Sequence, residues 1–258
     1  MNPEKFDLII EGNPLEVVAD VRDTGKNLLF FIHGLGCSKN SFHHFWNRVD
    51  FKEYSAFIPD LVGFGESSKP ESFSYAMETQ ARACAKILQR FSDKNLHIVA
   101  HSMGGAVALL LPHKILKHAK TFANVEGNLI DADCSILSRK IASATPAVFK
   151  LNILPEIRET LNRLGEKYAA IDAASATSLY RSAESLVGWS DSNQLLDKFF
   201  ALKCRKAYFY GEENTEHPTV SRVKEIQKFK IKRSGHFPMN DNPNDFYDKL
   251  FKFVTTSN

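Results

Sequence analysis

Short, mostly apolar runs and turn residues alternate at the start of the chain. Three such runs, at residues 6–10, 15–21 and 27–32, are separated by segments rich in Gly, Asn, Pro and Asp. Runs of this length between such residues are typical of β-strands, because glycine and proline interrupt regular structure and asparagine and aspartate favour turns. The chain is therefore expected to open with antiparallel strand pairing.

From residue 41 onwards, strand-like and helix-like segments follow one another in turn. The expected order is a helix around 41–49, a strand at 55–59, a helix at about 75–89, a strand at 96–100, a helix at 103–118 and a strand at 121–125. Such alternation predicts a parallel sheet with helices on both faces. Pro112 lies within one of these helices and is expected to kink or shorten it.

The pattern changes again in the second half of the chain. Residues 127–202 lack strand-like runs and are helical in character, with many Ala and Ser residues, whereas strand-like runs return at 205–210 and 229–232. Residues 244–253 place Phe246, Leu250 and Phe253 on one side of an amphipathic helix, which is predicted to close the chain. The strand-free segment is therefore expected to be an insertion between two strands of one sheet.

This organisation predicts an α/β fold, with a mostly parallel, doubly wound sheet and an inserted helical cap. A chain of 258 residues is long enough for one large domain, with 43% hydrophobic and 24% charged residues as in ordinary globular proteins. Residues 1–126 and 203–258 are expected to form the core, and residues 127–202 the cap.

The charge of the chain argues against several classes of partner. Its 33 basic and 30 acidic residues give a net charge of +3 and are spread along the sequence. Without a basic stripe, nucleic-acid binding is not expected. The N-terminus lacks the pattern of a signal peptide, and no apolar run of about eighteen residues could span a bilayer. We therefore expect a cytoplasmic protein that does not bind membranes.

The cysteines and histidines do not form a metal-ligand pattern. Four cysteines lie far apart, without a CxxC motif, at positions Cys37, Cys84, Cys134 and Cys204. They are predicted to be reduced thiols, and no HExxH motif occurs. Neither a metal nor an organic cofactor is expected.

A serine stands at a sharp turn between a predicted strand and a predicted helix. The sequence Ala-His-Ser-Met-Gly-Gly occupies residues 100–105, with apolar runs on both sides. Such a turn needs small residues two positions before and two after its apex, and Ala100 and Gly104 meet this need. Ser102 is then exposed at a helix N-terminus, where its hydroxyl can attack a carbonyl and the N–H of Met103 can face the resulting oxyanion.

Two further loops at the carboxyl ends of strands can complete this chemistry. His236 follows the last predicted strand, and such loops meet in one crevice of an open α/β sheet, so His236 is the candidate general base for Ser102. The segment His-Gly-Leu-Gly at residues 33–36 follows the third strand, and the N–H of Leu35 is the candidate second oxyanion donor. A dinucleotide loop is not expected there, because Lys39 stands where the third glycine would be.

Four motifs together resemble the α/β-hydrolase fold superfamily. They are residues 33–36, the loop 60–67, the turn around Ser102 and residues 235–238. The resemblance implies a serine hydrolase that cleaves an ester, thioester or lactone through an acyl-enzyme. It also implies that Asp60 braces the site. A serine at the apex argues against dehalogenases and epoxide hydrolases, which this superfamily builds with an aspartate nucleophile.

The acid of the catalytic triad departs from the usual family pattern. The family places it after the seventh strand, where this chain has Asn214, whose amide lacks the required negative charge. A second location in the superfamily, the end of the sixth strand, holds Glu126, which is the preferred candidate. Glu213, displaced by one residue, is an alternative, and a site without an acid is another.

The displaced acid leaves other functions open. One is a binding or receptor module with low turnover, and another is a cofactor-free lyase or oxygen enzyme, because the fold does not fix the reaction. The partner is expected to be a partly apolar small molecule. Aromatic and apolar side chains of the cap are candidates to line its pocket, namely Phe149, Leu151, Tyr168, Tyr180 and Trp189.

Overall fold

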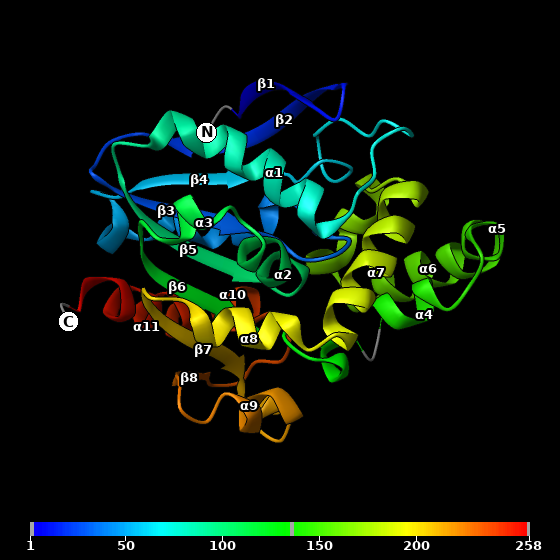
Figure 1. The fold of residues 1–258 in the computed structure, drawn as a ribbon. Coiled ribbons are helices and arrows are strands. Elements are labelled where there is room, and N and C mark those ends of the chain that lie inside the picture. Colours follow the sequence, from blue (N-terminus) through cyan, green and yellow to red (C-terminus); the bar gives the residue numbers. More distant parts are fainter. Residues whose placement is uncertain (1–2, 135–136, 257–258) are drawn as a thin grey trace.

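The computed structural model describes residues 3–134 and 137–256. These residues form one eight-stranded sheet in the order β1-β2-β4-β3-β5-β6-β7-β8 (Figure 1). The strands are β1 (Glu4–Ile10), β2 (Asn13–Arg22), β3 (Asn27–Ile32), β4 (Ser55–Pro59), β5 (Asn95–His101), β6 (Ala119–Val125), β7 (Arg205–Gly211) and β8 (Gln227–Ile231). The β1–β2 and β2–β4 pairs are antiparallel and the others parallel. The α/β fold class and the antiparallel opening are thus confirmed.

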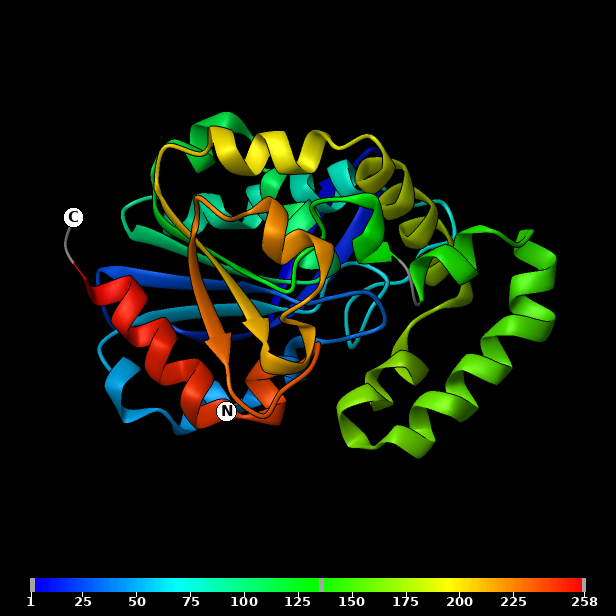
Figure 2. The same cartoon turned by 90° about the horizontal axis from the view of Figure 1, so that it is seen from below.

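Apolar residues on both sides of each central strand explain why helices cover both faces of the sheet. In β3, Leu28, Phe30 and Ile32 face one hydrophobic cluster, whereas Leu29 and Phe31 face another. Alternate residues of a strand point to opposite faces, so a continuous apolar run needs a cover on each side. Figure 2 shows these two layers of helices.

The two helical layers come from different parts of the chain. One face of the sheet is covered by α1 (Met77–Leu88), α2 (Met103–Leu109) and α8 (Gln194–Ala201), and the other by the 3-10 helix η1 (Lys39–Asn47) and α11 (Pro243–Thr255). The remaining short elements of the core are η2 (Val49–Phe51), η3 (Gln89–Phe91), α3 (His113–Leu116), η7 (Glu212–Asn214), α9 (Pro218–Arg222) and α10 (Pro238–Asp241).

Two local predictions about helices had different outcomes. The helix expected over 103–118 is interrupted at Pro112, which precedes α3, so the effect of this proline is confirmed. The helix expected around 41–49 is present as the 3-10 helix η1, which begins at Lys39 and ends at Asn47, and Val49 begins η2. The helix is kinked at Phe42, and both Phe42 and Phe45 contact Phe31, with ring centroids 4.9 Å away in each case.

The described residues between β6 and β7 form helices and no strand. They are η4 (Asp131–Cys134), α4 (Ser138–Ala142), α5 (Pro146–Val148), the π-helix η5 (Phe149–Ile153), α6 (Leu154–Leu164), η6 (Glu166–Ala173), α7 (Ala176–Asp191) and α8. Phe199 of α8 packs on Phe122 of β6, so this helix returns to the sheet. Elements α4 to η6 stand away from the sheet (Figure 2). None of the described helices combines the length and apolar character that crossing a bilayer requires.

Candidate active site

Ser102 lies at the turn between β5 and α2 in a strained backbone conformation. Its φ and ψ angles are 51° and −124°, a region that side-chain-bearing residues rarely adopt. A Cβ atom built on Gly104 would lie 2.3 Å from the backbone oxygen of Ile32, so only glycine allows α2 to pack this closely on the end of β3. The turn therefore has the small residue that the sequence pattern requires, and Ser102 remains half-exposed.

His236 lies between β8 and α10, and its ring reaches Ser102. His236 Nε2 is 3.1 Å from Ser102 Oγ, a hydrogen-bonding distance. The side chain of His236 is 43% exposed. The hydroxyl and imidazole are thus in contact at a position that a substrate can reach from solvent.

Glu126 follows β6 directly and faces the other nitrogen of the same ring. Its Oε2 lies 3.6 Å from His236 Nδ1, an ion-pair distance longer than a hydrogen bond. Such contacts are often long before substrate binds. Its Oε1 accepts a hydrogen bond from the N–H of Gly211 at 2.7 Å, and the side chain is only 7% exposed. The structure thus brings Ser102, His236 and Glu126 into one line of contacts.

The two residues after β7 that were considered as alternatives lie differently. The carboxylate of Glu213 lies beside the backbone of Gly235, where an added Cβ atom would be 2.9 Å from its Oε2. Within the described part of the chain, neither Glu213 nor Asn214 has a hydrogen bond or ion pair to His236. Of the three candidates, Glu126 is the one whose carboxylate faces the imidazole.

Leu35 lies in a tight turn next to Ser102. The N–H of Cys37 donates to the oxygen of Gly34 at 3.2 Å, and Gly36 has a φ of 69°, as the third position of a type II turn requires. A Cβ atom on Gly34 would lie 3.0 Å from Ser102 Cβ. The turn therefore runs directly against the serine, and Met103, at the first position of α2, has an N–H with no partner inside its helix.

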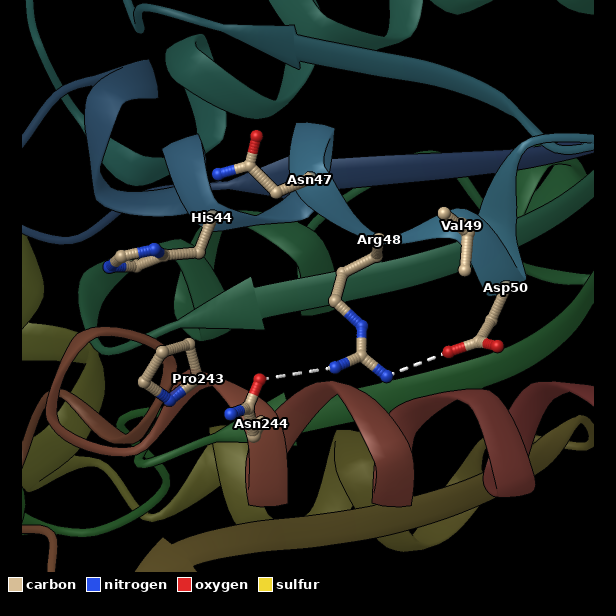
Figure 3. A pocket seen from close by; sticks show the side chains of 7 residues that line it. All are labelled: His44, Asn47, Arg48, Val49, Asp50, Pro243 and Asn244. Atoms are coloured by element: carbon tan, nitrogen blue, oxygen red, sulfur yellow. Dashed lines mark hydrogen bonds and ion pairs between the residues drawn. The ribbon is translucent and has the colours of Figure 1, made fainter.

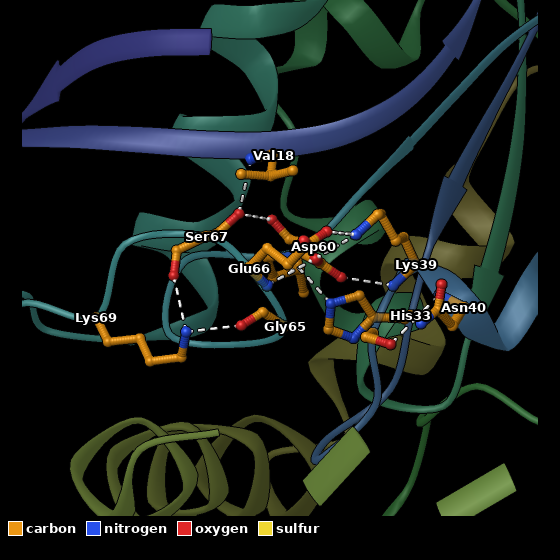
Figure 4. Close-up of polar contacts among 11 residues, drawn as sticks. Val18, His33, Lys39, Asn40, Asp60, Gly65, Glu66, Ser67 and Lys69 are labelled. Carbon is orange, nitrogen blue, oxygen red and sulfur yellow. Dashed lines mark hydrogen bonds and ion pairs between the residues drawn. The ribbon is translucent and has the colours of Figure 1, made fainter. Parts of the chain in front are cut away.

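Asp60 is buried and binds two loops together (Figure 4). Its Oδ1 accepts from the N–H of Lys39 at 2.7 Å, and its Oδ2 accepts from the N–H of Glu66 at 2.9 Å and from Lys39 Nζ at 3.1 Å. His33 Nε2 accepts from the N–H of Leu61 at 3.0 Å. The bracing role that the resemblance implies for Asp60 therefore has a physical basis in these contacts.

The ammonium group of Lys39 is nearly buried between two carboxylates. Burial acts to lower the pKa of Lys39, but hydrogen bonding and charge from Glu66 and Asp60 outweigh burial and raise it. An unpaired buried ammonium would be costly, whereas this one remains charged and joins η1 to the loop after β4.

Cys37 is buried near the same turn. Burial raises the pKa of its thiol to about 11. The thiolate is the nucleophilic form of cysteine, so Cys37 is inert at neutral pH. Cys37 is therefore not expected to compete with Ser102 as a nucleophile.

The side chains expected to line a pocket in the cap differ in position. Phe149 and Tyr180 are buried, with ring centroids 5.8 Å apart, and Trp189 is half-buried. Leu151 is 73% exposed and is therefore not among the candidates that line a pocket. It lies on the outer side of η5, which the sequence pattern did not distinguish. The side chain of Tyr168 lies outside the described part of the chain.

A surface pocket of about 330 Å³ lies between η1 and α11 (Figure 3). Arg48, in this pocket, donates to Asp50 Oδ2 at 2.7 Å and to Asn244 Oδ1 at 3.4 Å, and it also pairs with Asp248. Its charge is thus already matched by side chains of this chain. These contacts fasten η1 to α11 and provide no free cation for a ligand.

Sequence comparison identifies the family. The alpha/beta hydrolase fold family matches residues 27–242. The chain belongs to this family. The match begins at β3 and extends past α10, so this alpha/beta hydrolase shares with its family the loops that carry Leu35, Asp60, Ser102 and His236.

Two bacterial lipases are similar to part of this alpha/beta hydrolase. Lipase 1 of Psychrobacter immobilis is 38% identical over 106 residues, which are 41% of this chain and 33% of the lipase. Lipase 3 of Moraxella sp. (strain TA144) is 36% identical over 114 residues, which are 44% of this chain and 35% of the lipase. The similarity thus spans about a third of the length of each lipase.

Solved structures share the fold over the whole chain. A bromoperoxidase from Bacillus anthracis has a TM-score of 0.79 at 17% identity, covering 98% of this chain and 100% of its own. An esterase from Exiguobacterium antarcticum has a TM-score of 0.72 at 18% identity, covering 97% and 99%. At these identities the likeness concerns the fold alone.

Two residues of the site were not found from the sequence. Gly211 holds Glu126 through its N–H, and His101 donates a hydrogen bond to the backbone oxygen of His236 at 2.8 Å. Both contacts join residues more than eighty positions apart, so local spacing does not reveal them. For His101, the available signal was its place directly before Ser102.

Proposed function

We propose that the protein is a serine hydrolase that cleaves an ester-like bond, in an ester, thioester or lactone, through an acyl-enzyme on Ser102. The observation that carries this proposal is the continuous line of contacts from Ser102 Oγ through the two ring nitrogens of His236 to Glu126 Oε2. A serine hydroxyl becomes a useful nucleophile when a positioned base can take its proton. Membership in the alpha/beta hydrolase fold family supports the same chemistry.

The proposed reaction begins with attack by Ser102. His236 Nε2 accepts the hydroxyl proton while Oγ bonds to the carbonyl carbon, and the carbonyl π electrons move to the oxygen. The N–H groups of Leu35 and Met103 stabilise that oxyanion. Collapse breaks the bond to the leaving group, which takes the proton from His236. Water then attacks the acyl-enzyme in the same way, which releases the acid and restores the hydroxyl.

Glu126 acts through His236 rather than on the substrate. Its carboxylate faces Nδ1 and favours the tautomer that carries the proton there, which leaves Nε2 free to accept from Ser102. Its negative charge also stabilises the imidazolium that forms during attack. The hydrogen bond from Gly211 holds the carboxylate in this orientation.

We further propose that residues 127–202 form a cap over the site and that the substrate is a partly apolar small molecule. Ile171 of this segment lies against the oxyanion turn, where a Cβ atom on Gly36 would be 3.0 Å from its Cδ1. An apolar side chain therefore stands beside the proposed oxyanion donors. The relatives named as lipases, and a structural neighbour named as an esterase, support an ester-like substrate class.

An active-site probe tests the nucleophile directly. A fluorophosphonate, which phosphonylates an activated serine, should label the wild-type chain at Ser102. Labelling should disappear in Ser102→Ala and fall sharply in His236→Ala, because the hydroxyl is not activated without its base. Turnover of a short-chain aryl ester should fall at least ~10³-fold in both variants.

The control is Ser92→Ala, which alters an exposed serine that precedes β5, at the opposite end of this strand from Ser102. It should retain both labelling and turnover. Persistent labelling of Ser102→Ala would show that another residue is the nucleophile. A wild-type chain that takes no label and cleaves no ester, thioester or lactone would contradict the proposal and favour a binding module.

A further inference from the structure

His101 lies directly before Ser102 and is completely buried. Its Nε2 is 2.8 Å from the backbone oxygen of His236. A carbonyl oxygen only accepts hydrogen bonds, so Nε2 must carry the proton and donate it. The residue next to the proposed nucleophile is therefore bonded to the main chain of the proposed base.

The ring of His101 also supports the loop that carries His236. Its centroid lies 4.9 Å from that of His236, and 5.0 Å from that of Phe237. The loop is thus held by packing against His101 as well as by the hydrogen bond. Because His101 is fixed in β5, this contact relates the position of the base to the strand that carries Ser102.

The other ring nitrogen of His101 faces the oxyanion turn. A Cβ atom on Gly34 would lie 3.2 Å from Nδ1, and Nδ1 has no hydrogen-bond partner within the described part of the chain. Burial, and then the nearby His236, hold the pKa of His101 well below its usual value, so the ring is neutral. A neutral ring places no positive charge beside the imidazolium that His236 becomes during the proposed reaction.

Other backbone contacts hold the residues on both sides of His236. Gly235 donates its N–H to Asp241 Oδ2 at 3.0 Å, and Glu213 donates its N–H to the oxygen of Ser234 at 3.1 Å. Both contacts fix the start of the loop. On the other side of His236, the N–H groups of Asn240 and Asp241 donate to the oxygen of Phe237 at 2.9 and 2.8 Å, and the hydrogen bond from His101 holds the oxygen of His236 itself.

We infer that His101 is a positioning residue, whose Nε2–H bond to the backbone oxygen of His236 sets the imidazole between Ser102 and Glu126. The inference rests on the proposed function of these three residues. His101 has no substrate contact in this role and exchanges no proton. It acts by holding the base at the distance from the nucleophile that proton transfer needs, where errors of about 1 Å cost about 10²-fold in rate.

The test compares two substitutions in the full-length chain. Phenylalanine keeps an aromatic ring but has no donor, whereas the glutamine amide can donate from nearly the position of imidazole Nε2. We expect His101→Phe to lower kcat for the aryl ester about 10- to 100-fold, with little change in KM. His101→Gln should keep kcat within about threefold of wild type. If His101 only stabilised the fold, kcat would not fall at constant KM in His101→Phe, and His101→Gln would not restore kcat.

Hydrogen exchange follows the same contact without relying on activity. Amide exchange over residues 235–237 should accelerate about 10-fold in His101→Phe and change little in His101→Gln, because loss of the bond allows the loop to open locally. Exchange over β6 serves as the internal reference. In the wild-type chain, nitrogen NMR should detect a protonated Nε2 and an unprotonated Nδ1 for His101. This measurement does not depend on the folding of a variant.

The outcomes separate this inference from the proposed function. Wild-type kcat and wild-type loop exchange in a folded His101→Phe would overturn the positioning role, and so would a proton on Nδ1 instead of Nε2. If the wild-type chain cleaves no ester although loop exchange responds to the variants as expected, the proposed function is wrong and the contact still holds the loop.

Discussion

The Glu126 carboxylate is held by the backbone of the neighbouring strand. Its own N–H donates to the oxygen of Phe209 at 2.9 Å, and its Oε1 accepts from Gly211, both of which belong to β7. Since β6 and β7 run in parallel, their carboxyl ends open into the same crevice. An acid after β6 can therefore face the same histidine as an acid after β7. Moving the acid from the end of β7 to the end of β6 therefore does not require His236 to change position.

A comparison of two isosteric substitutions tests this placement. Glu126→Gln removes the charge and keeps the shape, so kcat should fall by about 10³ to 10⁴, as expected when the histidine loses its orienting acid. Glu213→Gln is the matched control and should leave kcat nearly unchanged, because its carboxylate lies beside Gly235. Steady-state kinetics on the aryl ester measures both. Loss of activity in Glu213→Gln with a nearly silent Glu126→Gln would place the acid after β7.

How far the sequence predicts this site depends on the range of each contact. Ser102 and its small neighbours follow from six consecutive residues, because the turn is a local structure. The two partners of His236 behave differently. The resemblance to a family points to Glu126 as the acid. The hydrogen bond from His101 joins residues 135 positions apart, and no sequence pattern points to it. Pairings of this kind depend on the packing of loops, which periodicity along a single chain does not encode.

At the scale of elements, one face of α7 fastens the inserted segment to the core. Ser178 Oγ donates to the oxygen of Gly63 at 2.8 Å, Ser182 Oγ donates to the oxygen of Tyr75 at 3.2 Å, and Ser185 Oγ accepts from the N–H of Met77 at 3.0 Å. Serines at spacings of four and three residues share one side of a helix. Three serines of this segment therefore serve to bond α7 to loops of the core. The high alanine and serine content alone does not show which serines do so.

Within the described part of the chain, α5, η5 and α6 make no hydrogen bond to the sheet or to the loops that α7 contacts. In Figure 2, α5, η5 and α6 stand out from the rest of the molecule, and Val148 and Leu151 on them are 46% and 73% exposed. The buried side chain of Phe149 packs on Tyr180 of α7 rather than on the sheet, and segments with few contacts to the core open at lower free energy than core elements. Opening of the proposed cap should therefore begin in α5 to α6, while α7 stays in place.

Hydrogen exchange can locate this opening. Amides of α6 should exchange faster than those of α7, and both faster than those of β5, since lids come from the less stable parts of a fold. Ser182→Ala should accelerate exchange in α7 by removing one contact to the core, whereas Ser92→Ala, at an exposed serine outside α7, should not. Core-like protection across α6 would argue against gating by this segment.

At the scale of the whole molecule, the sheet and its two layers bury three histidines, His33, His97 and His101, each 5% exposed or less. Burial lowers the pKa of each, and it lowers that of His97 to about 4, with further lowering from Arg205 and Lys120. The layers thus hold these rings neutral. At a pH where these histidines are protonated in the unfolded chain but not in the native chain, the free energy of unfolding must therefore decrease.

The pH dependence of unfolding tests this consequence at His97. Between pH 6.5 and about 4, an unfolded chain protonates this histidine and the native chain does not, so stability is full above pH 6.5 and declines as pH falls. The contribution of His97 should amount to about 2 kcal/mol between pH 6.5 and pH 5, at roughly 1.4 kcal/mol per pH unit. His97→Asn can retain the 2.9 Å contact with Thr121 Oγ1 and cannot be protonated in this range. Urea unfolding at pH 7 and pH 5 should therefore show a smaller pH effect in His97→Asn than in wild type.

The matched control for this measurement is His113→Asn at an exposed position, which should keep the wild-type pH effect. Because all other titrating groups are shared, the difference between the two variants isolates the buried ring. An equal loss of stability from pH 7 to pH 5 in His97→Asn and in wild type would mean that the native chain protonates His97 as readily as the unfolded chain. The interface of β5 and β6 would then admit the charge, and the layers would not hold this ring neutral.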